Sequence, residues 1–276
     1  MLPIPTRRLA DGKTIPALGF GTYPMDDAEA EIGVVTALDL GYRLIDTASA
    51  YGNEVGVGRG IANSGVERSE IFVTTKLRGA EHGFDETIAA LKGSLGRLDL
   101  DYVDLYLIHW PLPRVNKYVD SWRAMIQLRD EGLIGSIGVS NFNENHLERI
   151  QTETGEAPVV NQIELHPAWA QPHLREIDAR YDVVTESWSP LGRNLPLESY
   201  PPVAEAAKRH HKTPTQIVLR WHLQLGAIPI PKASSIEHQR ENLDVFSFEL
   251  SNEEMAAFAT IDQSRTAADP AVHEEF

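Results

Sequence analysis

The chain contains eight short apolar runs, rich in β-branched residues, that alternate with segments of helical periodicity. The runs lie near residues 18, 44, 73, 105, 137, 160, 184 and 228. Runs of this kind are typical of buried strands, and the helical segments between them favour parallel pairing. Eight strands alternating with helices predict a (β/α)8 barrel, a TIM barrel. The alternative is a doubly wound open sheet, which needs a phosphate-binding glycine turn after an early strand.

One glycine-rich segment, Gly56-Val57-Gly58-Arg59-Gly60, is a candidate for such a turn. It does not match the Gly-x-Gly-x-x-Gly pattern, because Ile61 stands where the pattern continues. It also begins several residues beyond a strand end, inside a helical pattern. Close packing of a small-residue helix face is the better interpretation.

Local signals at the element ends agree with the barrel. Residues 6–16 predict a β-hairpin around the Asp11-Gly12 turn, and this hairpin would close the N-terminal end of the barrel. The spacing of Asp26 and Glu29 predicts a capping box at a helix start, and Gly41 is placed to end that helix. Thr213-Pro214 predicts a later helix start in the same way.

Composition limits the function classes. A length of 276 residues suits one barrel, so residues 1–276 are expected to form a single domain. The net charge of −15 argues against a general nucleic-acid surface, and the lack of cysteine excludes disulfides, thiolate catalysis and Cys-based zinc sites. No segment has the roughly 20 apolar residues that span a bilayer or the apolar core of a signal peptide, so a cytoplasmic location is expected.

Four polar residues, Asp46, Tyr51, Lys76 and His109, lie at or just beyond the ends of apolar runs. Loops that leave the C-terminal strand ends of a parallel barrel form its active site. Taken singly, each residue has an ordinary structural interpretation: packing for the tyrosine, a solvated charge for the lysine, a structural role for the histidine. Convergence of all four at one barrel face favours catalysis.

These four residue types suit the reduction of a carbonyl by a bound hydride donor. Tyr51 can supply the proton that the carbonyl oxygen needs, although the pKa of a tyrosine is ordinarily about 10. Lys76 would favour the phenolate and lower that pKa, and Asp46 would hold Lys76 as an ion pair. His109 would orient the carbonyl by donating a hydrogen bond.

Further polar residues recur at the later strand ends. The amides of Asn141 and Gln162 suit a ligand carboxamide, and Trp188 suits stacking on a flat ring. Lys232 suits a phosphate. The alternatives to these ligand-binding roles are polar capping of the strand ends and core packing of Trp188, and the sequence favours neither interpretation over the other.

Seven longer motifs together resemble the aldo-keto reductase signature. They are Gly19-Phe20-Gly21-Thr22, Asp46-Thr47-Ala48-x-x-Tyr51-Gly52-Asn53-Glu54, Leu107-Ile108-His109-Trp110-Pro111, Gly138-Val139-Ser140-Asn141-Phe142, Asn161-Gln162-Ile163-Glu164-Leu165-His166-Pro167, Ser189-Pro190-Leu191-Gly192 and Ile230-Pro231-Lys232. The resemblance spans essentially the whole chain and extends to the prokaryotic 2,5-diketo-D-gluconate reductase group. It implies a monomeric barrel that reduces aldehydes and ketones with a nicotinamide cofactor and without a metal.

The same resemblance implies residue roles. Tyr51 would be the proton donor, tuned by Lys76 and Asp46, and His109 would orient the substrate. The cofactor-binding residues would be Gly21, Thr22, Asp46, Ser140, Asn141, Gln162, Trp188, Ser189, Leu191, Lys232, Ala233, His238, Glu241 and Asn242. The substrate rim would comprise Tyr23, Ser49 and Trp110, with the tail from residue 263 as a C-terminal loop over the active site.

Two departures from the family pattern bear on the cofactor. Lys232-Ala233 replaces the usual Lys-Ser, so one hydroxyl contact is absent. His238 stands where an arginine usually stacks on adenine and meets the 2′-phosphate; a neutral histidine can stack but carries no permanent charge. NADPH is therefore expected to remain preferred, but by less than in a typical relative, with NADH as the alternative cofactor.

The mixed aromatic and polar rim predicts aldehydes, small dicarbonyls or keto sugars as substrates. Two other function classes are weighed against a reductase. A cofactor-holding, redox-sensing binding module need not keep the proton donor, so the intact group of four favours catalysis. A metal-dependent barrel hydrolase is disfavoured because no paired His-x-His follows an early strand.

Overall fold

A computed structural model of the chain describes residues 3–193 and 195–275. Within those residues, eight parallel strands pair in chain order from β3 to β10. The strands are β3 (Phe20–Gly21), β4 (Leu44–Asp46), β5 (Phe72–Leu77), β6 (Val103–Ile108), β7 (Ile134–Ser140), β8 (Val160–Glu164), β9 (Val184–Trp188) and β10 (Ile228–Ile230). The predicted (β/α)8 barrel is confirmed.

Two backbone hydrogen bonds close the sheet between its first and last strands. The amide of Gly19 donates to the Pro229 carbonyl, and the amide of Gly21 donates to the Pro231 carbonyl, both over 3.1 Å. A Cβ on Gly19 would lie 2.5 Å from Ile230 Cδ1, so only glycine lets the two strands approach this closely. The first strand, β3, comprises only Phe20–Gly21, within the apolar run predicted near residue 18.

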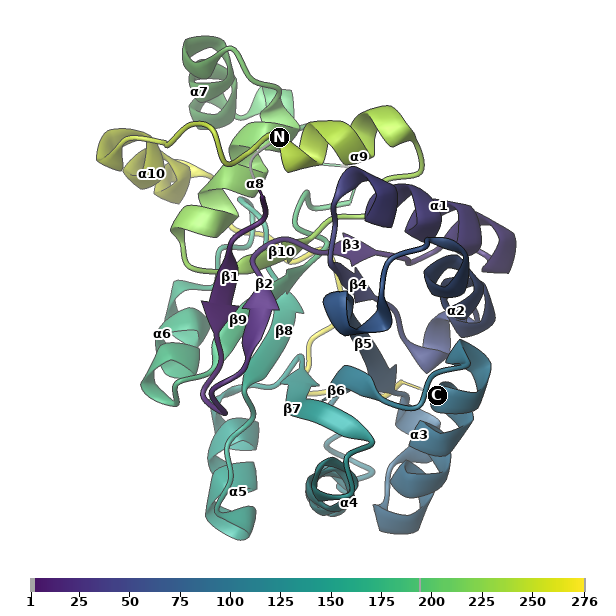
Figure 1. Cartoon of the computed structure of the whole chain (residues 1–276). Helices are drawn as coiled ribbons and strands as arrows, with labels where there is room; N and C mark the ends of the chain where they lie inside the picture. The colour runs from purple at the N-terminus through teal and green to yellow at the C-terminus, as the bar shows by residue number, and fades with distance from the viewer. Residues whose placement is uncertain (1–2, 194, 276) are drawn as a thin grey trace.

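The predicted hairpin consists of β1 (Thr6–Arg8) and β2 (Thr14–Pro16), which pair antiparallel. Leu9 and Ile15 are buried against barrel side chains such as Leu105 and Ile228. In Figure 1 the hairpin lies in front of the barrel and the yellow C-terminal tail passes behind it. The hairpin therefore covers the end opposite the tail, as the sequence predicted.

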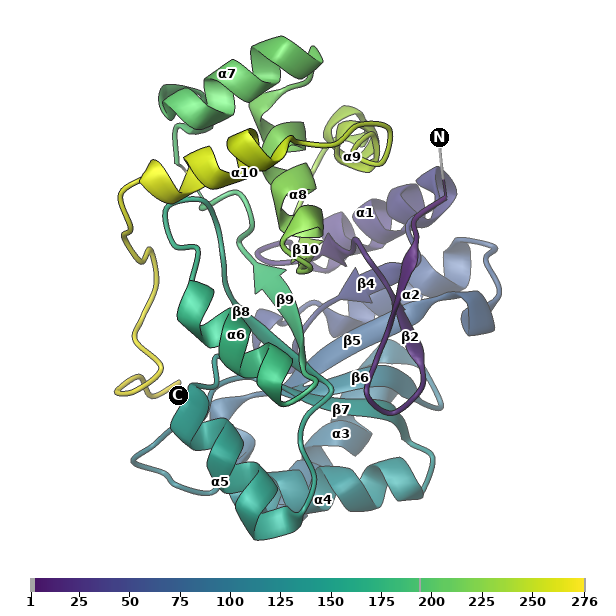
Figure 2. The same ribbon diagram turned by 90° about the vertical axis from the view of Figure 1, so that its left-hand side faces the viewer.

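Helices surround the strands as an outer layer in both views (Figure 1, Figure 2). They are α1 (Asp27–Leu40), α2 (Glu54–Asn63), α3 (Phe84–Leu98), α4 (Tyr118–Asp130), α5 (Glu144–Thr154), α6 (Pro172–Arg180), α7 (Pro201–His210), α8 (Pro214–Gln224), α9 (Ile236–Leu243) and α10 (Asn252–Ala257). The capping boxes that begin at Asp26 and Thr213 are both present, and Gly41 ends α1 in the left-handed conformation. Helix α9 was not anticipated from the sequence.

The glycines of α2 face neighbouring helices at backbone contact. A Cβ on Gly56 would lie 2.0 Å from the Asp27 carbonyl oxygen, and one on Gly58 would lie 2.2 Å from that of Leu98. The interpretation of this segment as a closely packed helix face is confirmed. Helix α2 carries no phosphate-loop pattern, and its glycines allow the close approach of α1 and α3.

Among the residues that the structure describes, none of the helices combines the length and apolar character needed to cross a membrane.

Candidate active site

The four predicted catalytic residues converge at the C-terminal end of the barrel. Asp46 ends β4, Lys76 lies in β5, and His109 directly follows β6. Tyr51 ends a short 3-10 helix, Ser49–Tyr51, in the loop after β4. Asp46, Tyr51 and His109 line a cavity of about 740 Å³, and Lys76 is fully buried beside them.

Lys76 is held by three oxygen atoms. Its Nζ lies 2.7 Å from Asp46 Oδ1, 3.0 Å from the Thr47 carbonyl oxygen and 3.3 Å from Tyr51 Oη. These partners use all three donors of the ammonium. Burial by itself lowers the pKa of Lys76, but the Asp46 carboxylate, together with the Tyr51 oxygen, outweighs it, so the pKa is raised and the lysine stays charged.

The phenol of Tyr51 behaves differently from the sequence-based expectation. Burial raises its pKa above the usual value, and this effect outweighs the opposing charge of Lys76, with Asp46 raising the pKa further. Lys76 does lower the pKa of Tyr51, as predicted, but the net pKa is raised because the prediction left out the cost of burying a phenolate. Tyr51 keeps its proton at neutral pH, as a proton donor must.

A residue from the C-terminal tail contacts His109. Glu275 Oε1 lies 2.8 Å from His109 Nδ1, and the two form an ion pair when the imidazole is protonated. Glu275 Oε2 accepts a hydrogen bond from the amide of Gly79 over 2.9 Å. Burial raises the pKa of Glu275, but His109 and the Gly79 amide lower it more, so the net pKa is below the usual value. The sequence offered no signal for this contact, since the tail has no periodicity.

Gln162, predicted to bind cofactor, links two carboxylates beneath the cavity. Its Nε2 donates to Asp46 Oδ2 over 2.8 Å and to Glu186 Oε2 over 2.7 Å. Both amide hydrogens are thereby used, and Oε1 is the atom that can still accept. Burial, with the charge of Asp46, raises the pKa of Glu186 to about 8. Glu186 was not selected from the sequence, although a charged residue inside a buried run is a usable signal.

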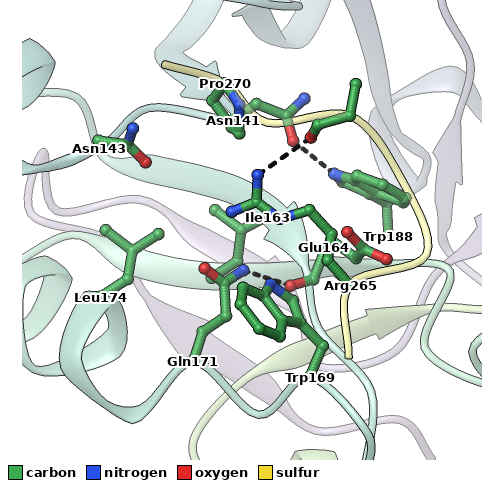
Figure 3. A pocket seen from close by; sticks show the side chains of 11 residues that line it. Asn141, Asn143, Ile163, Glu164, Trp169, Gln171, Leu174, Trp188, Arg265 and Pro270 are labelled. Carbon is green, nitrogen blue, oxygen red and sulfur yellow. Dashed lines mark hydrogen bonds between the residues drawn. The ribbon is translucent and has the colours of Figure 1, made fainter. Parts of the chain in front are cut away.

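Asn141 and Trp188 form a second polar link at the cavity wall. Trp188 Nε1 donates to Asn141 Oδ1 over 2.9 Å, and Asn141 Nδ2 donates to the His109 carbonyl oxygen over 3.0 Å. Ser140 is buried next to them and donates to the Gln162 carbonyl oxygen over 2.8 Å. Figure 3 shows Asn141 and Trp188 beside the tail, around a hollow of about 10 Å³ that has room for about one water molecule.

The remaining predicted cofactor residues divide into two groups. Gly21, Ser189, Leu191 and Lys232 line the same 740 Å³ cavity as Tyr51. The others lie behind its wall or on α9: Thr22, Ala233, His238, Glu241 and Asn242. Thr22, Ala233 and Asn242 are buried, His238 is exposed, and Glu241 accepts a hydrogen bond from Thr213 Oγ1.

The predicted substrate rim differs from the structure at one residue. Tyr23 and Trp110 line the cavity, and the Tyr23 ring lies 5.0 Å from that of Tyr51. Ser49 instead donates to the Lys76 carbonyl oxygen over 3.0 Å, and the cavity wall in that loop is formed by Ala50. Ser49 is turned away because its hydroxyl satisfies a carbonyl at the end of β5.

The tail from residue 263 runs along the C-terminal strand ends. The side chain of Gln263 accepts from the Ala170 amide over 2.7 Å, and the amide of Thr266 donates to Glu164 Oε1 over 2.7 Å. Figure 2 shows this segment, in yellow, leaving α10 and descending along one side of the barrel. Residue 276, the last of the predicted loop, lies outside the described residues.

Comparison with known proteins places the chain among relatives of similar length. Residues 17–263 match the model of the Aldo/keto reductase family. An "Aldo-keto reductase" of Mycolicibacterium smegmatis is 48% identical over 267 residues, which cover 96% of this chain and 97% of that protein. The 2,5-diketo-D-gluconic acid reductase B of a Corynebacterium strain is 46% identical, with 99% of each chain covered. A mutant of Gox0644, solved in complex with NADPH, superimposes with a TM-score of 0.94 at 43% identity, with 99% of each chain covered.

Proposed function

The chain belongs to the aldo/keto reductase family, and we propose that it reduces aldehydes, dicarbonyls or keto sugars to alcohols with NADPH. Tyr51 would donate the proton. The observation that carries this proposal is the buried series Asp46–Lys76–Tyr51, which opens onto a cavity large enough for a ligand. A solved relative bound to NADPH supports the choice of cofactor.

The residues of the cavity suit a nicotinamide dinucleotide. Asn141 and Gln162 offer amide groups at the end near Tyr51. Lys232 and Arg193 offer positive charge farther along the same wall, where phosphates would be held. When bound, the cofactor would supply the hydride, and the chain's own residues would supply the proton and the orientation.

Proton transfer follows from the contacts of Tyr51. Its Oη would hand its proton to the carbonyl oxygen of the substrate as hydride reaches the carbon. Lys76 Nζ, 3.3 Å away, would stabilise the phenolate left behind. Asp46 keeps that ammonium in place through the 2.7 Å ion pair. His109, whose ring centroid lies 5.8 Å from that of Tyr51, would orient the carbonyl.

Tyr51→Phe tests the proposal, because it removes the proton and keeps the ring. With methylglyoxal as substrate, NADPH oxidation should fall by a factor on the order of 10² or more, the usual contribution of a general acid. NADPH binding, measured by fluorescence titration, should change by only a few-fold. Tyr181→Phe, which removes a hydroxyl at the end of α6, is the matched control and should leave turnover intact.

Retention of turnover by Tyr51→Phe would contradict the assigned role. Tight NADPH binding by the wild-type chain without reduction of any carbonyl would instead support the redox-sensing binding module.

We also propose that residues 1–276 act as a single domain and a monomer in the cytoplasm, bound to no nucleic acid. The single barrel and the net charge of −15 support this. Sedimentation at micromolar concentration would test the monomer.

A further inference from the structure

The tail introduces a negative charge into the catalytic cavity that the proposed chemistry does not use. Glu275 lines the same cavity as Tyr51, His109 and Trp110, and its side chain is 20% exposed. Its carboxylate meets His109 at Nδ1, so Nε2 is the ring nitrogen left for a ligand. A substrate bound beside His109 would therefore lie close to a carboxylate.

Several contacts fix where Glu275 lies. The ring of His273 packs edge-on against Trp110 with centroids 4.4 Å apart, and Glu274 Oε1 accepts from the Arg114 amide over 2.8 Å. The amide of Gly79 donates to Glu275 Oε2. A Cβ on Gly79 would lie 2.0 Å from the Glu275 carbonyl oxygen, so the two backbones are in contact. The position of the Glu275 carboxylate is therefore fixed by its own backbone and by the backbone of Gly79.

The nearest group to the Glu275 carboxylate is His109, at 2.8 Å, which balances its negative charge only when the imidazole is protonated. The ammonium of Lys76 is already paired with Asp46. Burial lowers the pKa of His82, the neighbouring imidazole, to about 4, so this group is neutral at pH 7. The cationic side chains that line the cavity, Arg193 and Lys232, follow β9 and β10, three and four strands around the barrel from His109.

We propose that Glu275 is a specificity-determining residue that disfavours carbonyl substrates bearing a carboxylate and so selects neutral ones. This inference rests on the proposed function, since it concerns the substrate of the same cavity. Its physical basis is like-charge repulsion across a partly desolvated wall, where a unit charge a few ångströms away changes affinity by about tenfold. Specificity of this kind comes from a repulsive group against the wrong ligand.

A matched pair of aldehydes measures the effect: 4-formylbenzoate, an anion, and its methyl ester, which is neutral. Steady-state kcat/KM with NADPH at pH 7 and fixed ionic strength should favour the ester by about tenfold or more in the wild type. Glu275→Gln should reduce that ratio several-fold by improving the acid relative to the ester. Glu274→Gln removes the neighbouring charge that faces Arg114, and should keep the wild-type ratio.

The two proposals fail in different ways. Equal use of acid and ester by the wild type, or an unchanged ratio in Glu275→Gln, would overturn the specificity inference and leave the reductase intact. The inference would also be overturned if Glu274→Gln lowered the ratio as much as Glu275→Gln does. The effect would then come from the net charge of the tail and not from the position of Glu275. If the wild type reduces neither of these aldehydes and does not reduce methylglyoxal, the proposed function itself is wrong.

Discussion

At the scale of single residues, the site depends on which of two opposing effects is larger. Burial and Lys76 pull the pKa of Tyr51 in opposite directions, and burial wins. For the pKa of Lys76 the neighbouring groups have the larger effect, because Asp46 and Tyr51 together outweigh burial. The result is a protonated phenol beside a charged ammonium, the state that a proton donor to a carbonyl requires.

A second prediction at this scale concerns His238 and the choice between NADPH and NADH. His238→Arg places a permanent charge on the exposed face of α9, where the 2′-phosphate of NADPH is proposed to lie. The kcat/KM ratio of NADPH to NADH should rise by roughly tenfold or more, since a hydrogen bond to a charged group contributes about 1.5–3 kcal/mol. The measurement is steady-state reduction of methylglyoxal with each cofactor.

His173→Arg adds the same charge on α6, where the histidine side chain is 79% exposed, and it should leave the ratio unchanged. A wild-type chain that already prefers NADPH by several orders of magnitude would show that His238 does not weaken the preference.

At the scale of elements, the active site depends on helix packing far from the chemistry. Helix α2 follows the loop that carries Tyr51, and its glycines set how closely it approaches α1 and α3. Gly58 meets the backbone of Leu98, which cannot move away without shifting the end of α3. Protein interiors are packed densely enough that even one added methyl group in such a contact is felt.

Gly58→Ala should therefore destabilise the chain by about 2 kcal/mol, within the usual cost of overpacking. Gly96→Ala, in α3, is the matched control, because a Cβ there meets nothing within 4 Å. It should stabilise the chain by roughly 0.5–1 kcal/mol through helix propensity alone. Urea denaturation of both variants measures the two free energies of unfolding; equal effects would show that the contact at Leu98 is relieved at little cost.

At the scale of the whole molecule, buried ionisable groups couple stability to pH. His222 in α8 contacts Ser187 Oγ at 3.1 Å and the Pro190 carbonyl oxygen at 3.0 Å. It is fully buried, and burial lowers its pKa to about 3. Glu186 and Asp178 have pKa values raised by burial, to about 8 and about 7, so their effects have the opposite sign.

The contribution of the buried, neutral His222 to the free energy of unfolding should be fully present above pH 6.5 and be lost as the pH falls from 6.5 toward 3. The unfolded histidine takes up a proton in that range and the folded one does not, so the slope approaches about 1.4 kcal/mol per pH unit. His222→Gln should lack this slope, so the difference in unfolding free energy between wild type and variant should change with pH by up to about 1.4 kcal/mol per pH unit. Urea denaturation at pH 7, 6, 5 and 4 measures it, and parallel curves for the two chains would contradict the assignment.

The sequence alone was sufficient to predict the barrel and the positions of the candidate catalytic residues at its C-terminal end. Strand runs, capping boxes and the Asp11-Gly12 turn are local signals, because each depends on residues a few positions apart. Asp46, Lys76 and His109 converge since the C-terminal ends of parallel strands all open on one face. Any chain with this pattern of runs must bring those positions together.

Other features were decided only by tertiary structure. The direction in which the pKa of Tyr51 shifts depends on how completely other elements bury it, and no local pattern carries that quantity. Ser49 turns from the cavity because the Lys76 carbonyl, 27 positions away in the chain, needs a donor. Glu275 reaches His109 across 166 residues of sequence, through a tail without periodicity. Such contacts depend on where distant backbones come to lie, and local propensity does not determine that.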